Sequence, residues 1–507
     1  CRAIPSDSVR CDPDARAMAQ QVPDGDPSII SEFLSVTTHV APSPKPKFRD
    51  QVGGARPKIA VVSLAASGHM TPMMNLAEKL AERGHDVGVF GPHYIAEKTT
   101  AKCKKIGVTF ISVSTSPFES DDDFDVEAKK RNVFGYICHN DALEPGLREQ
   151  MTAFAPHCIV ADFCTTAGIK LAREMDLPLV INFAGPVSLA KQLMRAIDLE
   201  RTVMACGGCA CAISPFTPFS MAVALNLMSL GDYNAEMAWG FKHGLVLVNS
   251  FFGLEPAGLV PANVLLTGPL TPPVKSAASK LAGSHPKLAK FLETAVAKKQ
   301  KVVYVTTGSM AKLNGWQVAA IFHGLKATGC RTIWSLKKDL QPLLPDASDT
   351  AFFIDSWLPQ MDILLHDAVD LVITHCGWGG TLETIAGGKP IVSIPFFGDQ
   401  PLNARLLQES GCAEPIGPAP PLSFDSTSNG YVDNAFTAAS VETLVQKMLG
   451  EPAYKQAALR LMRLSVAAGG ATKAAERIEL AADFGVSYLT NVELSDKMMG
   501  KTICSVM

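Results

Sequence analysis

A chain of 507 residues is too long for one ordinary hydrophobic core, so two or three domains are expected. Hydrophobic residues make up 47% of the chain and charged residues 19%, which is typical of a packed globular protein and excludes a largely disordered one. The formal net charge of -3 argues against a nucleic-acid-binding protein, because neutralising phosphates requires a dense basic surface.

Residues 1–57 are polar and contain several prolines, so we expect a mostly disordered leader there. Strand and helix patterns begin directly afterwards. KIAVVSL (58–64) is a short apolar run of the kind found in buried parallel strands. MMNLAEKLAERG (73–84) has helical spacing and ends in glycine. The alternation continues with further strand-like runs at 86–90, 158–162 and 177–183.

A segment rich in proline and serine then interrupts the alternation, and we interpret residues 271–300 as a linker. Strand-like runs return at 301–307, 332–336, 351–357, 370–374 and 390–395. The sequence therefore predicts an α/β protein with two doubly wound domains, 58–270 and 301–475, and a tail, 476–507, that packs back on the first domain. Ligands of such sheets bind beyond the carboxyl ends of the strands, so we expect the site in a cleft between the domains.

The cysteines favour a cytoplasmic enzyme, because 13 of them, an odd number, are spread thinly and fit reduced thiols better than a disulfide framework. Cys206, Cys209 and Cys211 lie close together but lack a second ligand pair at zinc spacing, so we interpret them as buried thiols and predict no metal. Prolines and glycines break the uncharged stretch 202–231, which therefore suits a surface facing a lipophilic ligand or a membrane better than a spanning helix.

HCGWGGTLE (375–383) lies between a predicted strand and a predicted helix that Thr381 begins. Its glycines, Gly377, Gly379 and Gly380, let the backbone approach a ligand, and the free N–H groups of a helix start attract an anion such as a phosphate. His375 offers a ring N–H, and Glu383 offers a carboxylate that can accept from ribose hydroxyls. A tight turn with nothing bound is the alternative.

The neighbouring segments carry further candidate residues. Trp357 can stack on a flat base, and Gln360 can hydrogen-bond the edge of that base. Asp399 and Gln400 end a predicted strand at the expected cleft, where they are suited to reading sugar hydroxyls. Together with the glycine-rich turn, these residues indicate a site for a nucleotide linked to a sugar.

Residues 357–400 resemble the signature box of family 1 UDP-sugar-dependent glycosyltransferases, and plant members most closely. The pattern W-x-P-Q, H-C-G-W, E, G-x-P, P-x-x-x-D-Q is present in register, and a looser resemblance covers about residues 58–480. The resemblance implies a GT-B fold of two Rossmann-like domains facing across a cleft. It also implies a donor site in which uracil, ribose, diphosphate and sugar are bound by Trp357, Gln360, His375, Glu383, Asp399 and Gln400. The turn from Gly377 through Trp378 to Thr381 belongs to the same predicted donor site.

One part of the box departs from the plant pattern. Plant members usually read Trp-Asn-Ser where this chain has Trp378, Gly379 and Gly380, and those side chains help to hold sugar and phosphate. We expect backbone N–H groups and Thr381 to substitute for them. Ser309, after another predicted strand, matches a further family position that approaches the diphosphate, with simple turn chemistry as the alternative.

His69 follows the first predicted strand, where it would face the cleft with a pKa suited to a general base. A solvated loop histidine is the alternative. The resemblance implies the catalytic role, since these enzymes read G-H-x-x-P-x-x-x-L-A here and use the histidine to deprotonate the acceptor. Asp162 ends a strand of the same sheet at the position of the family's acid partner, which would fix the imidazole tautomer; it could also cap a helix.

These patterns predict an inverting hexosyltransferase that moves glucose, or else glucuronic acid, from a UDP-sugar to a small lipophilic acceptor: a sterol, phenol, lipid or xenobiotic hydroxyl. The UDP-sugar is a co-substrate, and no cofactor, metal or nucleic acid is expected. A sugar-nucleotide epimerase of the same fold and a non-catalytic UDP-sugar-binding protein are the alternatives. Membrane association is left open.

Overall fold

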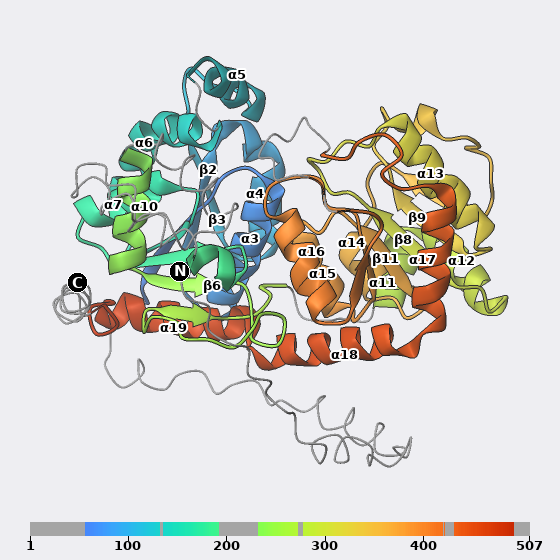
Figure 1. Cartoon of the computed structure of the whole chain (residues 1–507). Coiled ribbons are helices and arrows are strands. Elements are labelled where there is room, and N and C mark those ends of the chain that lie inside the picture. The colour runs from blue at the N-terminus through green and yellow to red at the C-terminus, as the bar shows by residue number, and fades with distance from the viewer. Residues whose placement is uncertain are drawn as a thin grey trace, which may run out of the picture. The chain divides into compact units, whose positions relative to one another are not determined.

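The computed structural model describes residues 56–131, 135–191, 232–271, 277–418, 420 and 430–490. Within these ranges the chain forms two parallel β-sheets with helices packed against them (Figure 1). Most of the predicted leader, the cysteines at 206–211, the uncharged stretch 202–231 and the end of the predicted tail lie outside the described residues. No helix in the described ranges is long and apolar enough to cross a membrane.

The first sheet has seven parallel strands in the order β3-β2-β1-β4-β5-β6-β7. Their bounds are β1 Lys58–Val62, β2 Asp86–Pro92, β3 Thr109–Val113, β4 Cys158–Asp162, β5 Leu179–Phe183, β6 Leu245–Val248 and β7 Val264–Leu266. Every residue of β4 and β5 is buried, as expected when helices cover both faces of a parallel sheet. The strand order reverses between β1 and β4, and this switch point is where doubly wound sheets bind their ligands.

Apolar helix faces cover the two sides of this sheet. One side is packed by α6 (Gly135–Phe154), α7 (Thr166–Glu174) and α10 (Asp232–His243). The other side is packed by α3 (Ser67–Glu82), α4 (Ala96–Lys105) and α19 (Gly470–Phe484). A short η2 (His93–Ile95) and α5 (Asp121–Arg131) complete this domain. The seven cysteines in the described ranges are all free and buried, which agrees with the prediction of reduced thiols.

The second sheet has six parallel strands in the order β10-β9-β8-β11-β12-β13. Their bounds are β8 Val302–Thr306, β9 Arg331–Ser335, β10 Phe352–Asp355, β11 Leu371–Thr374, β12 Ile391–Ser393 and β13 Ala413–Pro415. The accompanying helices are α13 Gly315–Ala327, η4 Gln341–Leu343, α14 Gln360–Leu364, α15 Trp378–Ala386, α16 Gln400–Glu409, α17 Ala438–Gly450 and α18 Pro452–Ala467. The structure thus has the two Rossmann-like domains that the alternation predicted.

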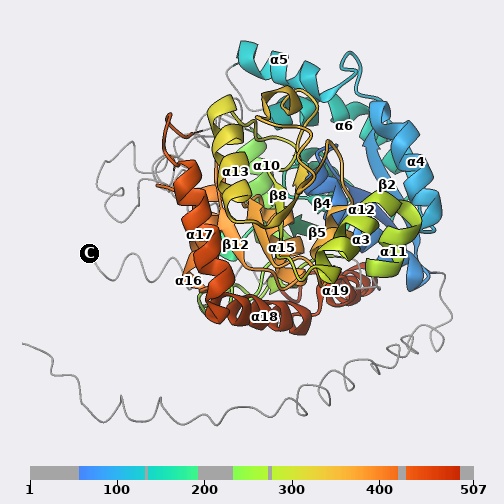
Figure 2. The same ribbon diagram turned by 90° about the vertical axis from the view of Figure 1, so that its right-hand side faces the viewer.

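Residues 271–300, predicted as a linker, contain two helices, α11 (Ala277–Ser284) and α12 (Pro286–Ala297), which Figure 2 shows side by side. Leu288 and Leu292 of α12 are buried in one cluster with Val302 and Tyr304 of β8. This stretch therefore belongs to the core of the second domain and is not a linker. Its prolines suggested a linker, but Pro286 is the first residue of α12. Proline is well tolerated there because the first N–H of a helix has no partner within the helix.

The last described helix, α19, returns the chain to the first domain. Arg83 Nε and Nη2 donate to the two carboxylate oxygens of Glu479 over 2.8 and 2.6 Å, and His85 Nε2 lies 2.7 Å from Glu479 Oε1. The N–H of Gly470 donates to the carbonyl of Thr267 over 2.7 Å. The return therefore begins at about Gly470, six residues before the predicted start of the tail at 476.

Candidate active site

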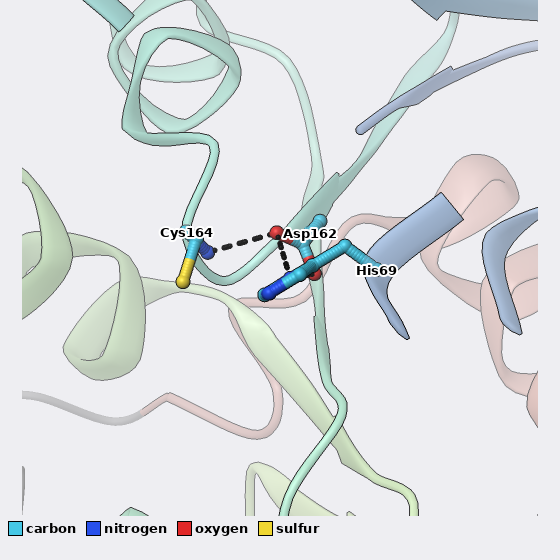
Figure 3. Close-up of side chains that lie close together, drawn as sticks. All are labelled: His69, Asp162 and Cys164. Atoms are coloured by element: carbon cyan, nitrogen blue, oxygen red, sulfur yellow. Dashed lines mark hydrogen bonds and ion pairs between the residues drawn. The ribbon is translucent and has the colours of Figure 1, made fainter. Parts of the chain in front are cut away.

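His69 and Asp162 form a hydrogen-bonded pair at the switch point of the first sheet (Figure 3). His69 lies in the first turn of α3, and its Nδ1 is 2.9 and 3.0 Å from the two carboxylate oxygens of Asp162, the last residue of β4. The Asp162 side chain is fully buried, whereas that of His69 is 25% exposed. The imidazole is therefore the member of the pair that a substrate can reach.

The Asp162 carboxylate is held by the turn that follows it. Its Oδ2 accepts from the N–H of Cys164 over 3.0 Å and from Thr165 Oγ1 over 3.5 Å. The helix N-cap predicted for Asp162 is instead Thr165, the residue before α7. The carboxylate thus braces the turn and binds the imidazole at the same time, which fixes the orientation of the ring.

Three influences set the pKa of His69. Burial is the largest, and it lowers the pKa because the low-dielectric interior disfavours the imidazolium. The charge and hydrogen bond of Asp162, together with the charge of Asp399, outweigh burial and raise the pKa above 6.5. Since Asp399 belongs to the second domain, the base of the first domain lies within electrostatic reach of a predicted sugar-binding residue.

Cys164 lies beside the pair (Figure 3), and His69, Asp162 and Cys164 form the one described group whose side chains could hold a metal ion, with ligand atoms within 4.8 Å of one another. The Cys164 thiol is buried, which raises its pKa well above the usual range. In the absence of a metal ion the thiol therefore keeps its proton. We interpret the group as a hydrogen-bonded His–Asp pair with a neighbouring neutral thiol.

In the second domain, the glycine-rich turn runs from the end of β11 at Thr374 to α15. A Cβ added at Gly377 would lie 2.5 Å from His375 Nε2, and one added at Gly308 would lie 2.6 Å from the same nitrogen. These two glycines therefore make room for the His375 ring, a role that differs from the predicted approach of backbone to phosphate. Burial lowers the pKa of His375 to about 4 despite a hydrogen bond with the Thr306 backbone, so the ring is neutral and carries one N–H.

The helix start differs from the prediction. α15 begins at Trp378 with Gly377 as N-cap, and the Thr381 N–H already donates to the Gly377 carbonyl over 2.9 Å. Thr381 therefore does not begin the helix, and its side chain is fully buried. The free N–H groups at this helix start are those of Trp378, Gly379 and Gly380.

The indole of Trp378, a predicted donor-binding residue, is bound to the first domain. It is 5% exposed, and its Nε1 donates to the backbone carbonyl of Asn249 in the first domain over 3.0 Å. It packs in a cluster with Phe251 and Leu254 of the first domain. The side chain therefore ties the glycine-rich turn to the other domain, and only its backbone N–H remains at the helix start.

Gln360 and Glu383, predicted to contact the base and the ribose, lie side by side. Gln360 Nε2 donates to Glu383 Oε2 over 2.5 Å, and Gln360 Oε1 accepts from Tyr304 and Thr306 hydroxyls over 3.2 and 3.0 Å. Burial raises the pKa of Glu383 despite the hydrogen bond from Gln360. Tyr304 and Thr306 were missed in the sequence because they lie inside an apolar strand run.

The other residues predicted to bind the donor come from the loops of the second domain. Trp357 is 70% exposed, as a base-stacking residue requires, and Ser309 is exposed after Gly308. Asp399 is the N-cap residue of α16, and its Oδ2 accepts from Asn403 Nδ2 over 2.7 Å. Gln400 is 4% exposed, and its Oε1 accepts from the N–H of Phe396 over 2.9 Å, so the turn already uses the oxygen that was predicted to read a sugar.

Comparison with known proteins agrees with this geometry. Residues 267–467 match the family model "UDP-glucoronosyl and UDP-glucosyl transferase". UDP-glycosyltransferase 72E2 of Arabidopsis thaliana is 27% identical over 418 residues, which cover 70% of this chain and 82% of that protein. Anthocyanidin 3-O-galactosyltransferase F3GT1 of Actinidia chinensis var. chinensis is 37% identical over 178 residues, covering 33% of this chain and 38% of that protein.

Solved structures give the same class. Os79 from O. sativa, in complex with U2F and trichothecene, matches with a TM-score of 0.65 at 19% identity, covering 84% of this chain and 100% of that chain. The calicheamicin glycosyltransferase CalG4 matches with a TM-score of 0.58 at 18% identity, covering 85% and 100%. The chain therefore has the GT-B fold, with two Rossmann-like domains. Residues 267–467 carry the UDP-glucoronosyl and UDP-glucosyl transferase domain, and with its relatives this makes the chain a glycosyltransferase similar to the family 1 UDP-glycosyltransferases, as the signature box predicted.

Proposed function

We propose that this enzyme transfers a hexose from a UDP-sugar to a hydroxyl of a small lipophilic acceptor, with inversion at the anomeric carbon. The observation that carries the proposal is the His69–Asp162 pair, an accessible imidazole on a fully buried carboxylate, within electrostatic reach of Asp399 in the second domain. An epimerase would instead need acidic groups at the sugar, and a binding protein would not need the pair at all.

His69 acts as the general base. Its Nδ1–H donates to Asp162, which leaves Nε2 to take the proton of the acceptor hydroxyl. The acceptor oxygen forms a bond to the anomeric carbon as the bond from that carbon to the diphosphate oxygen breaks, and the electron pair leaves with UDP. Because attack and departure occur on opposite sides of the carbon, the configuration inverts. Asp162 stabilises the imidazolium that results.

The second domain stabilises the leaving group. The free N–H groups at the start of α15 donate to the diphosphate as its negative charge grows, and the Ser309 hydroxyl adds a further donor. The neutral ring of His375 turns its one N–H from the Thr306 backbone to the diphosphate. Hydrogen-bond donors supply this stabilisation, so we propose that transfer needs no metal. Turnover that persists in excess chelator supports this, and loss of turnover that added Mg²⁺ restores contradicts it.

Glucose on a phenolic or polycyclic hydroxyl is the reaction we favour. The relatives include a UDP-glucose flavonoid 3-O-glucosyltransferase of Fragaria ananassa, and one matching structure holds trichothecene. Aromatic rings stand beside the base, with Phe163 centred 5.5 Å from the His69 ring and 4.5 Å from Phe183. An apolar wall next to the base suits a lipophilic acceptor.

A panel experiment tests the proposal. The protein is incubated with UDP-glucose, UDP-galactose and UDP-glucuronic acid, each with a mixture of lipophilic alcohols and phenols, and products are identified by mass. Proton coupling at the anomeric position of the product then gives its configuration. Conversion of one UDP-sugar to another without acceptor would favour the epimerase, and UDP-sugar binding without any product would favour the binding protein.

A further inference from the structure

His139 is a buried polar side chain for which the reaction above has no use. It lies in α6 and is 4% exposed. Its Nε2 has no hydrogen-bond partner among the residues that the structure describes. A polar atom that is buried without a partner costs free energy, because it has lost water and gained nothing. A bound molecule that supplies a partner would recover that free energy.

The position of His139 relates it to the catalytic pair. Its neighbour Asn140 donates from Nδ2 to the Cys164 carbonyl over 2.8 Å and accepts at Oδ1 from the Ala167 N–H over 3.0 Å. This part of α6 is therefore fastened to the turn that follows Asp162. The charge of a protonated His69 also lowers the pKa of His139, which shows that the two rings lie within electrostatic reach.

The surroundings of His139 are aromatic. Its ring centroid lies 4.8 Å from that of Phe124, which lies 4.8 Å from that of Phe118. Burial is the main reason that the pKa of His139 falls to about 4, so the ring is neutral at physiological pH. A neutral imidazole has one nitrogen that donates and one that accepts, and it can pair with a hydroxyl or a carbonyl group.

We propose that His139 Nε2 binds a second polar group of the acceptor, so that the enzyme prefers aromatic acceptors carrying a second hydroxyl or carbonyl to otherwise identical acceptors with one hydroxyl. The hydroxyl that is glycosylated lies at His69, and the second group lies at His139. This inference rests on the proposed function, because it needs His69 to position the attacking hydroxyl. It adds an acceptor class defined by two polar groups on one aromatic frame.

The test compares acceptors that differ in one polar group. The probes are 1-naphthol and 2-naphthol beside the 1,5-, 1,6-, 2,6- and 2,7-dihydroxynaphthalenes, which place a second hydroxyl at different spacings on one frame. For each, kcat/KM is measured per hydroxyl with the same UDP-sugar. We expect the wild-type enzyme to prefer at least one dihydroxynaphthalene by about 10-fold or more, since an unpaired buried group penalises the analogue that lacks its partner.

Two variants separate recognition from a structural role. In His139→Leu the preference should fall to within about twofold, mainly through a raised KM for the dihydroxy acceptor. His139→Gln, whose carboxamide reaches about as far as Nε2, should restore part of the preference. A purely structural histidine would lower kcat/KM for both acceptor types by one factor, leave the preference intact and lower the melting temperature; that result would overturn the proposal.

The outcome also separates this inference from the proposed function. Transfer to the naphthols without any preference for a second hydroxyl, at any spacing, would contradict the role of His139 and leave the transferase function supported. Failure of the wild-type enzyme to glycosylate any probe, with every UDP-sugar of the panel, would contradict the proposed acceptor class itself.

Discussion

The two domains have the same sheet order around their switch points, yet they place different chemistry there. In the first domain, His69 lies at the start of the helix that follows β1 and Asp162 ends β4, so an accessible imidazole is paired with a buried carboxylate. The equivalent strands of the second domain, β8 and β11, are followed by Gly308 and His375, and Gly308 leaves room for the His375 ring.

The difference between the two histidines lies in what each one faces. The negative charges of Asp162 and Asp399 raise the pKa of His69. His375 is packed between two glycines with no carboxylate beside it, and its pKa is about 4. One histidine can therefore take a proton at neutral pH, and the other stays neutral and donates an N–H. In the proposed mechanism, these different surroundings suit His69 to the role of base and His375 to the leaving-group site.

Removing the base should have the largest effect. In His69→Ala no group remains that takes the acceptor proton, so we expect transfer to fall by about 10²–10⁴-fold. Since the proposed UDP site is in the other domain, the affinity for UDP, measured by calorimetry, should change by less than about twofold. If this variant forms product at the wild-type rate, His69 is not the general base.

Removing the charge of Asp162 should have the second largest effect, and this effect should depend on pH. Asp162→Asn removes the charge that raises the pKa of His69, while the burial that lowers this pKa remains. We expect kcat to fall by about 10²-fold or more and the acidic limb of the rate profile to move to lower pH, because the imidazole then loses its proton more readily. Rates from about pH 5 to pH 9 in both proteins check this, and an unshifted limb would show that Asp162 does not set the pKa of the base.

A smaller effect is expected from crowding the second histidine. Gly377→Ala would place a Cβ 2.5 Å from His375 Nε2, so the ring must leave its position. We expect UDP to bind about 10-fold more weakly, which is the loss of roughly one hydrogen bond to a charged group. Gly315→Ala is the matched control, because a Cβ there meets no atom within 4 Å and lies at the start of α13. Equal UDP affinity in the wild type, Gly377→Ala and Gly315→Ala would show that His375 does not bind the diphosphate.

Sequence patterns predicted the fold and the His69–Asp162 pair for a physical reason. Parallel strands place their carboxyl ends at one edge, so residues that end neighbouring strands meet even when 93 positions separate them. The alternation of strands and helices also predicted both sheets, although β3, β6, β7 and β13 were missed.

The errors concern contacts that no local pattern records. Thr381 was expected at a helix start and lies buried in the helix, since α15 begins with the bulky Trp378. The unpaired nitrogen of His139 depends on what surrounds it in space, which the sequence does not show. Trp378 was read as a donor residue, but its partner Asn249 is 129 positions away in the other domain.

That contact between the domains gives the prediction with the smallest expected effect. Trp378→Phe keeps an apolar ring but removes the N–H that donates to the Asn249 carbonyl, so it tests whether this bond holds the glycine-rich turn at the correct distance from His69. We expect kcat to fall about 3- to 10-fold with little change in UDP affinity, since a buried acceptor left unpaired costs about 1–3 kcal/mol.

Trp334→Phe is the matched control for that variant. Trp334 is fully buried in β9, and its Nε1 has no hydrogen-bond partner among the described residues, so the change removes the same volume without breaking a bond. If both variants lower the melting temperature but only Trp378→Phe lowers kcat, the indole positions the donor turn against the base. Equal losses of kcat would mean that Trp378 contributes packing alone, and that the two histidines keep their distance by other contacts.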